Sequence, residues 1–207
     1  MQIAPSKSLS QAKMLGGIGS ILTLLLFVPY YIGAGLVIIG WILILIAVKD
    51  ISETVMDKSI FNKAIISVVL SIVGVVTFAA IVAVTLLSFF SGGGTLPMAG
   101  STSLPTGFLG LIAGLLIGLA IVWVCSIIAS YFLWQSFKGI SARLPVGLFG
   151  TGGLVFFIGS LLIIAFGIGF FLMFIAEILF AVAFFQLPDN PQPMPAMQPS
   201  MGTPGTP

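Results

Sequence analysis

Glu177 is the residue with the clearest capacity for chemistry, because this acidic side chain lies well inside a long apolar stretch. An unpaired carboxylate at the middle of a membrane is costly, so Glu177 there must be neutral or hydrogen-bonded. One interpretation makes it a proton- or cation-binding carboxylate. The other makes it a satisfied packing residue. The second is favoured, because the spans contain no paired acid, no histidine and no partner base.

The remaining polar residues do not assemble into an enzyme site. The chain has no histidine, so Ser, Thr and Cys side chains in the spans cannot be built into an acyl-transfer triad. The single cysteine, Cys125, excludes an intramolecular disulfide and a cysteine-rich metal site. The glycine run Ser91–Gly94 has no lysine after it, unlike a phosphate-binding loop. We therefore expect no enzymatic activity, no cofactor, no metal and no nucleic-acid partner.

The composition indicates which kind of structure positions Glu177. Hydrophobic residues make up 59% of the chain and charged residues 6%, with a mean hydropathy of +1.28. Soluble domains carry about 25% charged residues. Three long runs contain no charge at all, at Met14–Val48, Ala64–Phe137 and Leu144–Ala176. Because about 20 apolar residues suffice to cross a membrane, the chain is predicted to be a polytopic membrane protein with the lipid bilayer as its surroundings.

Six apolar segments follow from the turn residues that interrupt these runs. They make an all-α, six-segment helical bundle, since the segments lack the polar alternation of membrane barrels. The predicted spans cover about 9–28, 33–48, 61–90, 107–137, 148–166 and 169–187. They form a single transmembrane domain, 1–187, with a polar connector at 49–63 and a short basic turn at 138–145. The Pro/Met-rich tail, 188–207, is predicted to be disordered.

Segment lengths divide the bundle into two kinds of element. The second segment, 33–48, would be about 24 Å long as a helix, short for a hydrocarbon core of about 30 Å. The third, 61–90, would reach about 45 Å and must tilt or project from the bilayer. The prediction is two short terminal hairpins flanking two long helices. Either hairpin is able to span fully or to be re-entrant.

The cations predict the orientation. With the N-terminus inside, all seven Lys and Arg residues lie on the cytoplasmic side. The outer loops, Pro29–Ile32, Ser91–Thr106 and Gly167–Ile168, contain none. This distribution follows the positive-inside rule. It predicts a multi-pass protein of the cytoplasmic membrane with both termini in the cytoplasm.

The two terminal hairpins align with each other as a parallel repeat. Gly16-Gly17 falls on Gly152-Gly153 and Ile32-Gly33 on Ile168-Gly169. The alignment sets Trp41 opposite Glu177, and we expect the Trp41 indole N–H to donate to the Glu177 carboxyl at mid-membrane depth. Other donors at comparable depth are Thr77, Cys125 and Ser126.

Glycines mark candidate packing faces on two helices. Gly110, Gly114 and Gly118 are spaced four apart, which forms a flat stripe that lets another helix approach closely. Gly16 and Gly17 mark a similar face on the first segment. The stripe favours packing within the chain over homodimerisation, but both interpretations remain open.

Several segments together resemble a known prokaryotic membrane family. They are Leu9–Lys13 with Gly16–Leu22, Ile44–Lys49 with Ser59–Asn62, and Gly153–Gly159 with Ala183–Pro188. These residues resemble the family called domain of unknown function 996, over roughly Leu9–Pro188. The resemblance implies a multi-spanning protein of the cytoplasmic membrane and brings no catalytic residues.

The scarcity of polar residues in the spans predicts a non-enzymatic scaffold or accessory subunit. It would pack its glycine faces against itself, as a homo-oligomer, or against a larger membrane complex. The alternative is a small transporter or channel that uses Glu177, favoured by the parallel hairpins and their glycine-broken outer tips.

Overall fold

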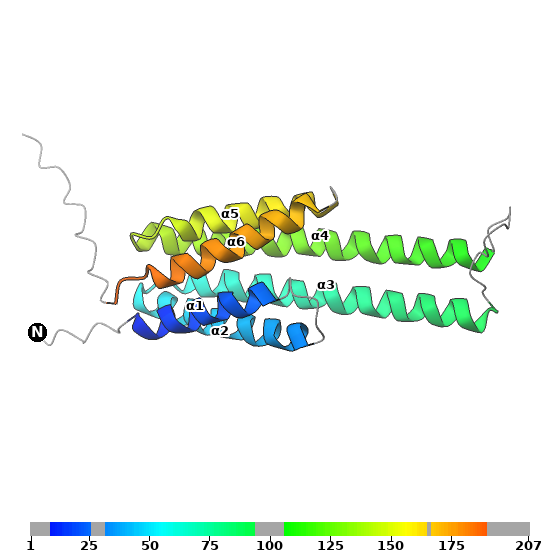
Figure 1. Ribbon diagram of the computed structural model, residues 1–207, viewed down its shortest axis with the longest axis horizontal. Coiled ribbons are helices and arrows are strands. Elements are labelled where there is room, and N and C mark those ends of the chain that lie inside the picture. The colour runs from blue at the N-terminus through cyan, green and yellow to red at the C-terminus, as the bar shows by residue number, and fades with distance from the viewer. Residues whose placement is uncertain (1–8, 26–31, 94–105, 165–166, 190–207) are drawn as a thin grey trace, which may run out of the picture.

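The computed structural model describes residues 9–25, 32–93, 106–164 and 167–189. In these ranges the chain forms six α-helices and one 3₁₀ turn, and no strand (Figure 1). The elements are α1 (Ser10–Leu24), α2 (Ile32–Thr54), α3 (Lys58–Ser91), α4 (Thr106–Arg143), α5 (Leu148–Leu161), η2 (Leu162–Ile164) and α6 (Ile168–Phe185). The predicted all-α, six-segment bundle is confirmed.

Four of the helices are long and apolar enough to cross a membrane. These stretches are Gly35–Thr54, Lys58–Ser91, Gly107–Arg143 and Ile168–Phe185, and Leu148–Ile164 is a shorter apolar helix. Of the four, α3 and α4 are the longest, at 34 and 38 residues. At 1.5 Å per residue they reach about 50 Å or more, well beyond the hydrocarbon thickness of about 30 Å.

Two helices continue past the charges that were expected to end them. The helix α2 runs through Lys49 to Thr54, so the first part of the polar connector belongs to it. The helix α4 runs through Lys138 to Arg143, and the expected basic turn begins only at Leu144. Charged side chains extend from the end of a helix into water without interrupting its backbone hydrogen bonds. Near the end of α2, Lys49 and Glu53 form an i,i+4 ion pair with Nζ and Oε1 3.9 Å apart.

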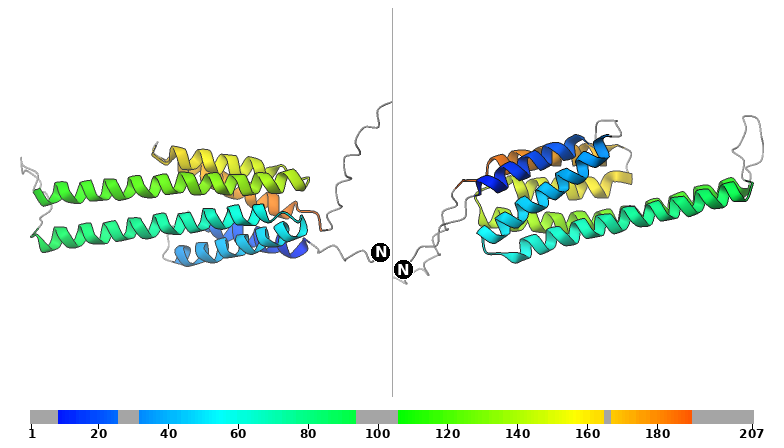
Figure 2. Two further views of the ribbon diagram at one scale, coloured as in Figure 1. Left: turned by 180° about the vertical axis from the view of Figure 1, so that it is seen from behind. Right: turned by 90° about the horizontal axis from the view of Figure 1, so that it is seen from below.

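The helices contact one another in a closed ring. Each packs on the next along the chain, and α1 packs on α6, which closes the ring. Figures 1 and 2 show that both terminal hairpins lie along the same part of the long helices, with α1 and α5 running in the same direction. We call this part the basic half, because its end carries the described cations Lys13, Lys49, Lys58, Lys63, Lys138 and Arg143.

The core of the protein lies in the basic half and is aromatic. Phe137 of α4 is 1% exposed, and its ring centroid lies 4.6 Å from that of Phe180 in α6. Phe149 of α5 meets Phe184 of α6 edge-on at 4.9 Å. Edge-to-face geometry at these distances is the favoured arrangement of aromatic rings. The core therefore joins the last three helices tightly.

Short polar side chains fix the turns at the basic end. Asp57 caps α3 by accepting hydrogen bonds from Ser59 N at 3.0 Å and Ser59 Oγ at 2.7 Å. Arg143, at the end of α4, lies 3.3 Å from the same carboxylate. The Ser59 hydroxyl hydrogen bond, and after it the Ser59 N–H and the charges of Arg143 and Lys63, lower the pKa of Asp57 below its usual 3.8. Asp57 is therefore a charged cap that ties α3 to α4.

Beyond the hairpins, α3 and α4 continue alone as a two-helix projection (Figures 1 and 2). We call residues 77–91 and 107–122 the distal arm. Its side chains are mostly apolar and exposed, with Leu87 at 68%, Phe90 at 71% and Leu116 at 60%. Of its described hydrophobic side chains only Phe89 is buried. The arm thus has an apolar surface that no other part of the described chain covers.

The first and last described segments meet at the basic end. Leu9 N donates to the Asp189 carbonyl at 3.1 Å, and Lys13 Nζ lies 3.5 Å from the Asp189 carboxylate. Pro188 and Asp189, the first two residues of the predicted tail, are thus held against α1. Residues 190–207 lie outside the described residues, so the predicted disorder there stays a prediction.

Candidate functional site

Glu177 lies on α6 in the interface with α1 and is 5% exposed. The two helices approach closely because glycines on α1 leave room for phenylalanines of α6. A Cβ at Gly16 would overlap the Phe184 ring, and one at Gly17 would lie 2.6 Å from Phe185. Small residues at such positions let helix backbones approach closely in a membrane. This approach brings Glu177 within hydrogen-bonding distance of α1.

Thr23 is the hydrogen-bond partner of Glu177. The Thr23 hydroxyl lies 2.7 Å from Glu177 Oε2 and 2.8 Å from the Ser20 carbonyl oxygen. A hydroxyl carries one proton and therefore donates to only one of these acceptors. When Thr23 donates to the carboxylate, Glu177 is satisfied as an anion. When it donates to Ser20, a protonated Glu177 donates to Thr23. The pair accommodates either form.

Ser20 supplies another buried hydroxyl on α1, about one turn before Thr23. Its side chain is fully buried, and its hydroxyl has no hydrogen-bond partner among the described residues. Thr23 and Glu177 together are able to hold a proton. The described residues contain no group of three His, Cys, Asp or Glu side chains that could hold a metal ion.

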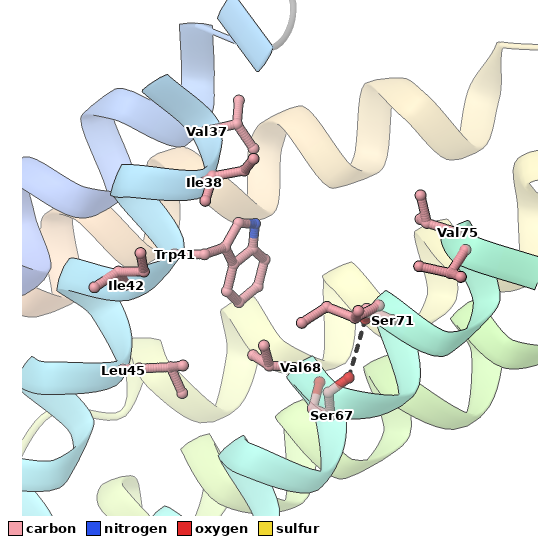
Figure 3. Close-up of a pocket in the computed structure, with 11 residues that line it drawn as sticks. Val37, Ile38, Trp41, Ile42, Leu45, Ser67, Val68, Ser71 and Val75 are labelled. Atoms are coloured by element: carbon pink, nitrogen blue, oxygen red, sulfur yellow. Dashed lines mark hydrogen bonds between the residues drawn. The ribbon is translucent and has the colours of Figure 1, made fainter. Parts of the chain in front are cut away.

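The structure does not bring together Trp41 and Glu177, the two residues of the predicted polar site. Trp41 extends from α2 toward α3 and lines a groove between them (Figure 3), and no hydrogen bond joins it to Glu177 among the described residues. The expectation that Glu177 is hydrogen-bonded is met by Thr23 instead. Thr23 was missed because the repeat alignment compares depths and says nothing about which helix faces meet. The spacing Gly16, Ser20, Thr23 follows one helix face and was the available signal.

The other donors considered for Glu177 lie on the long helices. Thr77 is half-buried on α3, and Ser126 and Cys125 are half-buried on α4. Cys125 packs against Gly74 of α3, where an added Cβ would lie 2.8 Å from the Cys125 Cβ. Cys125 thus belongs to the contact between α3 and α4.

The glycine stripe on α4 divides into two parts. Gly114 packs against Thr85 of α3, and a Cβ at Gly118 would lie 3.1 Å from the Phe78 ring. Gly110 has open space around it and lines a cavity of about 330 Å³ at the tip of the arm. Two of the three glycines thus serve contact within the chain, and the third leaves a gap between the helices.

A second buried polar contact joins α4 to α5. The hydroxyls of Ser130 and Ser160 lie 2.6 Å apart, and both side chains are buried. Trp123 Nε1 donates to the Ser160 carbonyl at 3.1 Å. These bonds hold the second hairpin on the long helices, as Thr23 and Glu177 hold the first hairpin on α6.

The two hairpins run in the same direction, as a parallel repeat requires, but their contacts differ. Gly16 and Gly152 are equivalent in the alignment. Gly16 packs on Phe184, in the other hairpin, whereas Gly152 packs on Phe180, in its own hairpin. The two hairpins are therefore alike in sequence and in direction, but equivalent residues in them do not make equivalent contacts.

Comparison with known proteins places this arrangement in a family. No solved structure matches the chain. An uncharacterised protein of Methanocaldococcus jannaschii is 36% identical over 184 residues, covering 88% of this chain and 94% of the relative. The family model described as protein of unknown function (DUF996) matches residues 36–178, which takes in most of the ring and the whole distal arm. The chain belongs to the DUF996 family.

Proposed function

We propose that the protein is a non-enzymatic scaffold or accessory subunit of a membrane complex. The distal arm carries this proposal. Its exposed apolar side chains have no partner among the described residues, and two helices longer than a bilayer is thick expose more apolar surface than one spanning pair requires. A membrane partner, either a second copy or a larger complex, would cover this surface.

The polar groups of the ring support a structural role. Glu177 with Thr23 and Ser130 with Ser160 bond across helix interfaces, so these side chains contribute to packing. Interhelical hydrogen bonds of this kind stabilise membrane bundles by about 0.6 kcal/mol on average. The protein, in this proposal, presents a fixed bundle and uses the arm for assembly.

The location we propose is the cytoplasmic membrane, with the basic end and both termini in the cytoplasm. The clustering of the described cations at one end of the bundle supports this orientation, because cytoplasmic segments are enriched in Lys and Arg. The distal arm then points to the opposite face. Labelling of single cysteines introduced at Glu53 and Ser91 by a membrane-impermeant maleimide in intact cells tests it, with Cys125 replaced by Ala. We expect labelling at position 91 alone.

Purification in mild detergent from the native membrane tests the scaffold proposal. We expect a particle heavier than one 21.7 kDa chain with its detergent, as a homo-oligomer or with a stoichiometric second protein. The double variant Leu87→Gln/Leu116→Gln places polar groups on the arm and should release single chains. Val69→Gln is the control, because Val69 is 53% exposed on α3 outside the arm. A wild-type protein that purifies as a lone single chain would refute the proposal.

Glu177 supports a second candidate, a small transporter. A carboxyl buried within a membrane bundle often marks an ion or proton pathway. Glu177→Gln separates the two functions. Loss of ion or proton flux in liposomes with unchanged assembly favours transport, whereas disrupted assembly favours the packing role.

A further inference from the structure

A groove of about 510 Å³ runs between α2 and α3 on the side of the bundle (Figure 3). Its walls include Ile38, Trp41 and Leu45 from α2, and Val68, Ser71 and Val75 from α3. Among helices that are neighbours in the ring, α2 and α3 make the least contact. The groove lies where these two helices diverge, and it opens away from the core.

The surface of the groove favours a hydrocarbon. Nine of its lining residues are apolar, and the Trp41 ring extends across the space toward α3 (Figure 3). Ser71 Oγ donates to the Ser67 carbonyl at 3.0 Å, so its hydroxyl is satisfied within α3. Sites of this size and composition bind apolar ligands. In a membrane, an apolar groove that opens sideways is filled by lipid or by another apolar segment.

The length of the groove matches one lipid chain. Along α3 the lining extends from Ser67 to Val76, which is about 14 Å at 1.5 Å per residue. The hydrocarbon core of a bilayer is about 30 Å thick, and each leaflet contributes about half of it. A chain that enters at the basic end would therefore fill the groove and end near the middle of the bilayer.

Cations lie one helical turn beyond the groove at its basic end. Lys49 follows Leu45 by four positions and Lys63 precedes Ser67 by four, so each lies on the same helix face as a lining residue. Lys63 is half-buried, and of the groups that lower the pKa of Asp57 its charge has the smallest effect. The nearby Asp57 is bound by Arg143 and Ser59. Lys49 lies 3.9 Å from Glu53, with both side chains about half exposed.

We propose that the α2–α3 groove is a binding site for an anionic glycerolipid. One chain lies along the groove against Trp41, and the phosphate lies between Lys49 and Lys63. Basic residues between transmembrane helices bind anionic lipid head groups in this way. The lysine side chains reach the phosphate level while their stems remain in the apolar region.

Tryptophan quenching by lipids with brominated chains tests this site. The full chain is reconstituted into phosphatidylcholine vesicles that contain phosphatidylglycerol, with bromine on the chains of one lipid or the other. The protein has three tryptophans, and the difference between the wild type and Trp41→Phe isolates the signal from the groove. We expect phosphatidylglycerol to be preferred about fivefold at Trp41, the effect of one lysine, because Lys49 is already paired with Glu53 and Lys63 supplies most of the attraction. Trp123→Phe, treated likewise, should show a preference near one at Trp123, which lies on α4 well before its first cation, Lys138.

Two variants and one control connect the preference to the groove. Lys63→Gln should bring the preference at Trp41 close to one. Val75→Phe, which fills the groove from an exposed position on α3, should do the same while the protein remains folded. Lys13→Gln removes a cation from the same end of the bundle but from α1, and should leave the preference unchanged.

Equal quenching by the two lipids at Trp41 would overturn the proposal, because the groove would then hold ordinary bulk lipid. The same conclusion follows if Lys13→Gln lowers the preference as much as Lys63→Gln, since the effect would be one of overall charge. Absence of quenching at Trp41 would mean that protein fills the groove, and this also refutes a lipid site. None of these outcomes depends on whether the distal arm binds a partner.

Discussion

The basic half of the bundle and the distal arm contain equally apolar helices but use them differently. In the basic half, large rings enter spaces left by small residues, as Phe184 does at Gly16. In the arm, α3 and α4 touch along one narrow seam at Gly114 and Gly118, and most other side chains point away from the protein. Both parts are built from the same residue types, chiefly Val, Ile, Leu, Phe and Gly.

This difference shows what determines a core when all residues are apolar. Lipid chains are as apolar as leucine, so hydrophobicity does not drive helices together inside a membrane. Close packing and hydrogen bonds between helices must do so. The described basic half has both, in the Phe137 cluster and in the Glu177–Thr23 bond. The arm has a single buried phenylalanine, Phe89, and two glycine contacts.

The largest effect is expected from filling a packed glycine. Gly16→Leu would place a side chain where the Phe184 ring lies, so the two helices would have to move apart. Overpacking typically costs about 1–3 kcal/mol, and this site should lie at or above the top of that range. We expect little folded protein by size-exclusion chromatography in detergent. Gly110→Leu is the matched control on the arm, because Gly110 has open space, and it should purify like the wild type. If Gly16→Leu and Gly110→Leu lost equal amounts of folded protein, the basic half would not be more tightly packed than the arm.

The next largest effect concerns the carboxyl of the ring. Glu177→Leu leaves the buried Thr23 hydroxyl without its partner across the interface and should lower the free energy of unfolding by about 1–2 kcal/mol. Glu177→Gln should cost much less, since its amide is able to donate to Thr23. Unfolding in mixed detergent micelles measures both. A Glu177→Gln variant as unstable as Glu177→Leu would show that the negative charge itself is required.

Asp57 gives a smaller and pH-dependent effect. Its pKa is lowered in the folded protein, so its stabilising contribution is present above the usual value of 3.8 and is lost as the pH falls further through the folded pKa. Asp57→Ala should cost about 1 kcal/mol at pH 7, as expected for a helix cap. The difference in thermal midpoint between wild type and Asp57→Ala should shrink below pH 4. A constant difference down to pH 2 would contradict this origin.

The smallest effect is expected from the hydrogen bond that holds the second hairpin on α4. Ser130→Ala, Ser160→Ala and the double variant form a cycle across α4 and α5. Their coupling energy should be about 0.6 kcal/mol, the average for hydrogen bonds in membranes. Phe89→Ala with Leu111→Ala, a cycle on two residues of the arm helices that line the same cavity, serves as the comparison. Coupling in the arm as strong as that at Ser130 would mean that its seam is as specific as the ring.

The residues that defined the fold class in advance were the few charged ones. Charges divide the chain into apolar runs near Lys49–Lys63 and Lys138–Arg143, and proline- and glycine-containing turns divide each run again, so the number and kind of helices follow from the sequence alone. The exact ends do not, since Lys49 and Lys138 extend into water while their helices continue. Local propensity leaves the terminal turns of a helix undetermined.

The partner of Glu177 shows where sequence reasoning ended. That a buried carboxyl needs a hydrogen bond follows from electrostatics alone, and the structure provides one. The donor depends on which faces of α1 and α6 meet, and this is set by the fit of Phe184 at Gly16. Residues so distant in sequence carry no periodic signal of their contact. The groove beside Trp41 was likewise invisible, because it arises from two helices diverging.

The closure of the ring by α1 and α6 has a consequence for biosynthesis. Thr23 is synthesised long before Glu177, which lies 154 positions later in the chain. Until α6 is inserted, the glycine face of α1 is uncovered. The hydroxyls of Ser20 and Thr23, which are buried in the finished protein, are then exposed to lipid. The first helix is therefore completed by the last, and a ribosome that stalls before α6 leaves an open bundle. A membrane quality-control protease could recognise the exposed face of α1 in such a chain, and this face is covered in the finished protein.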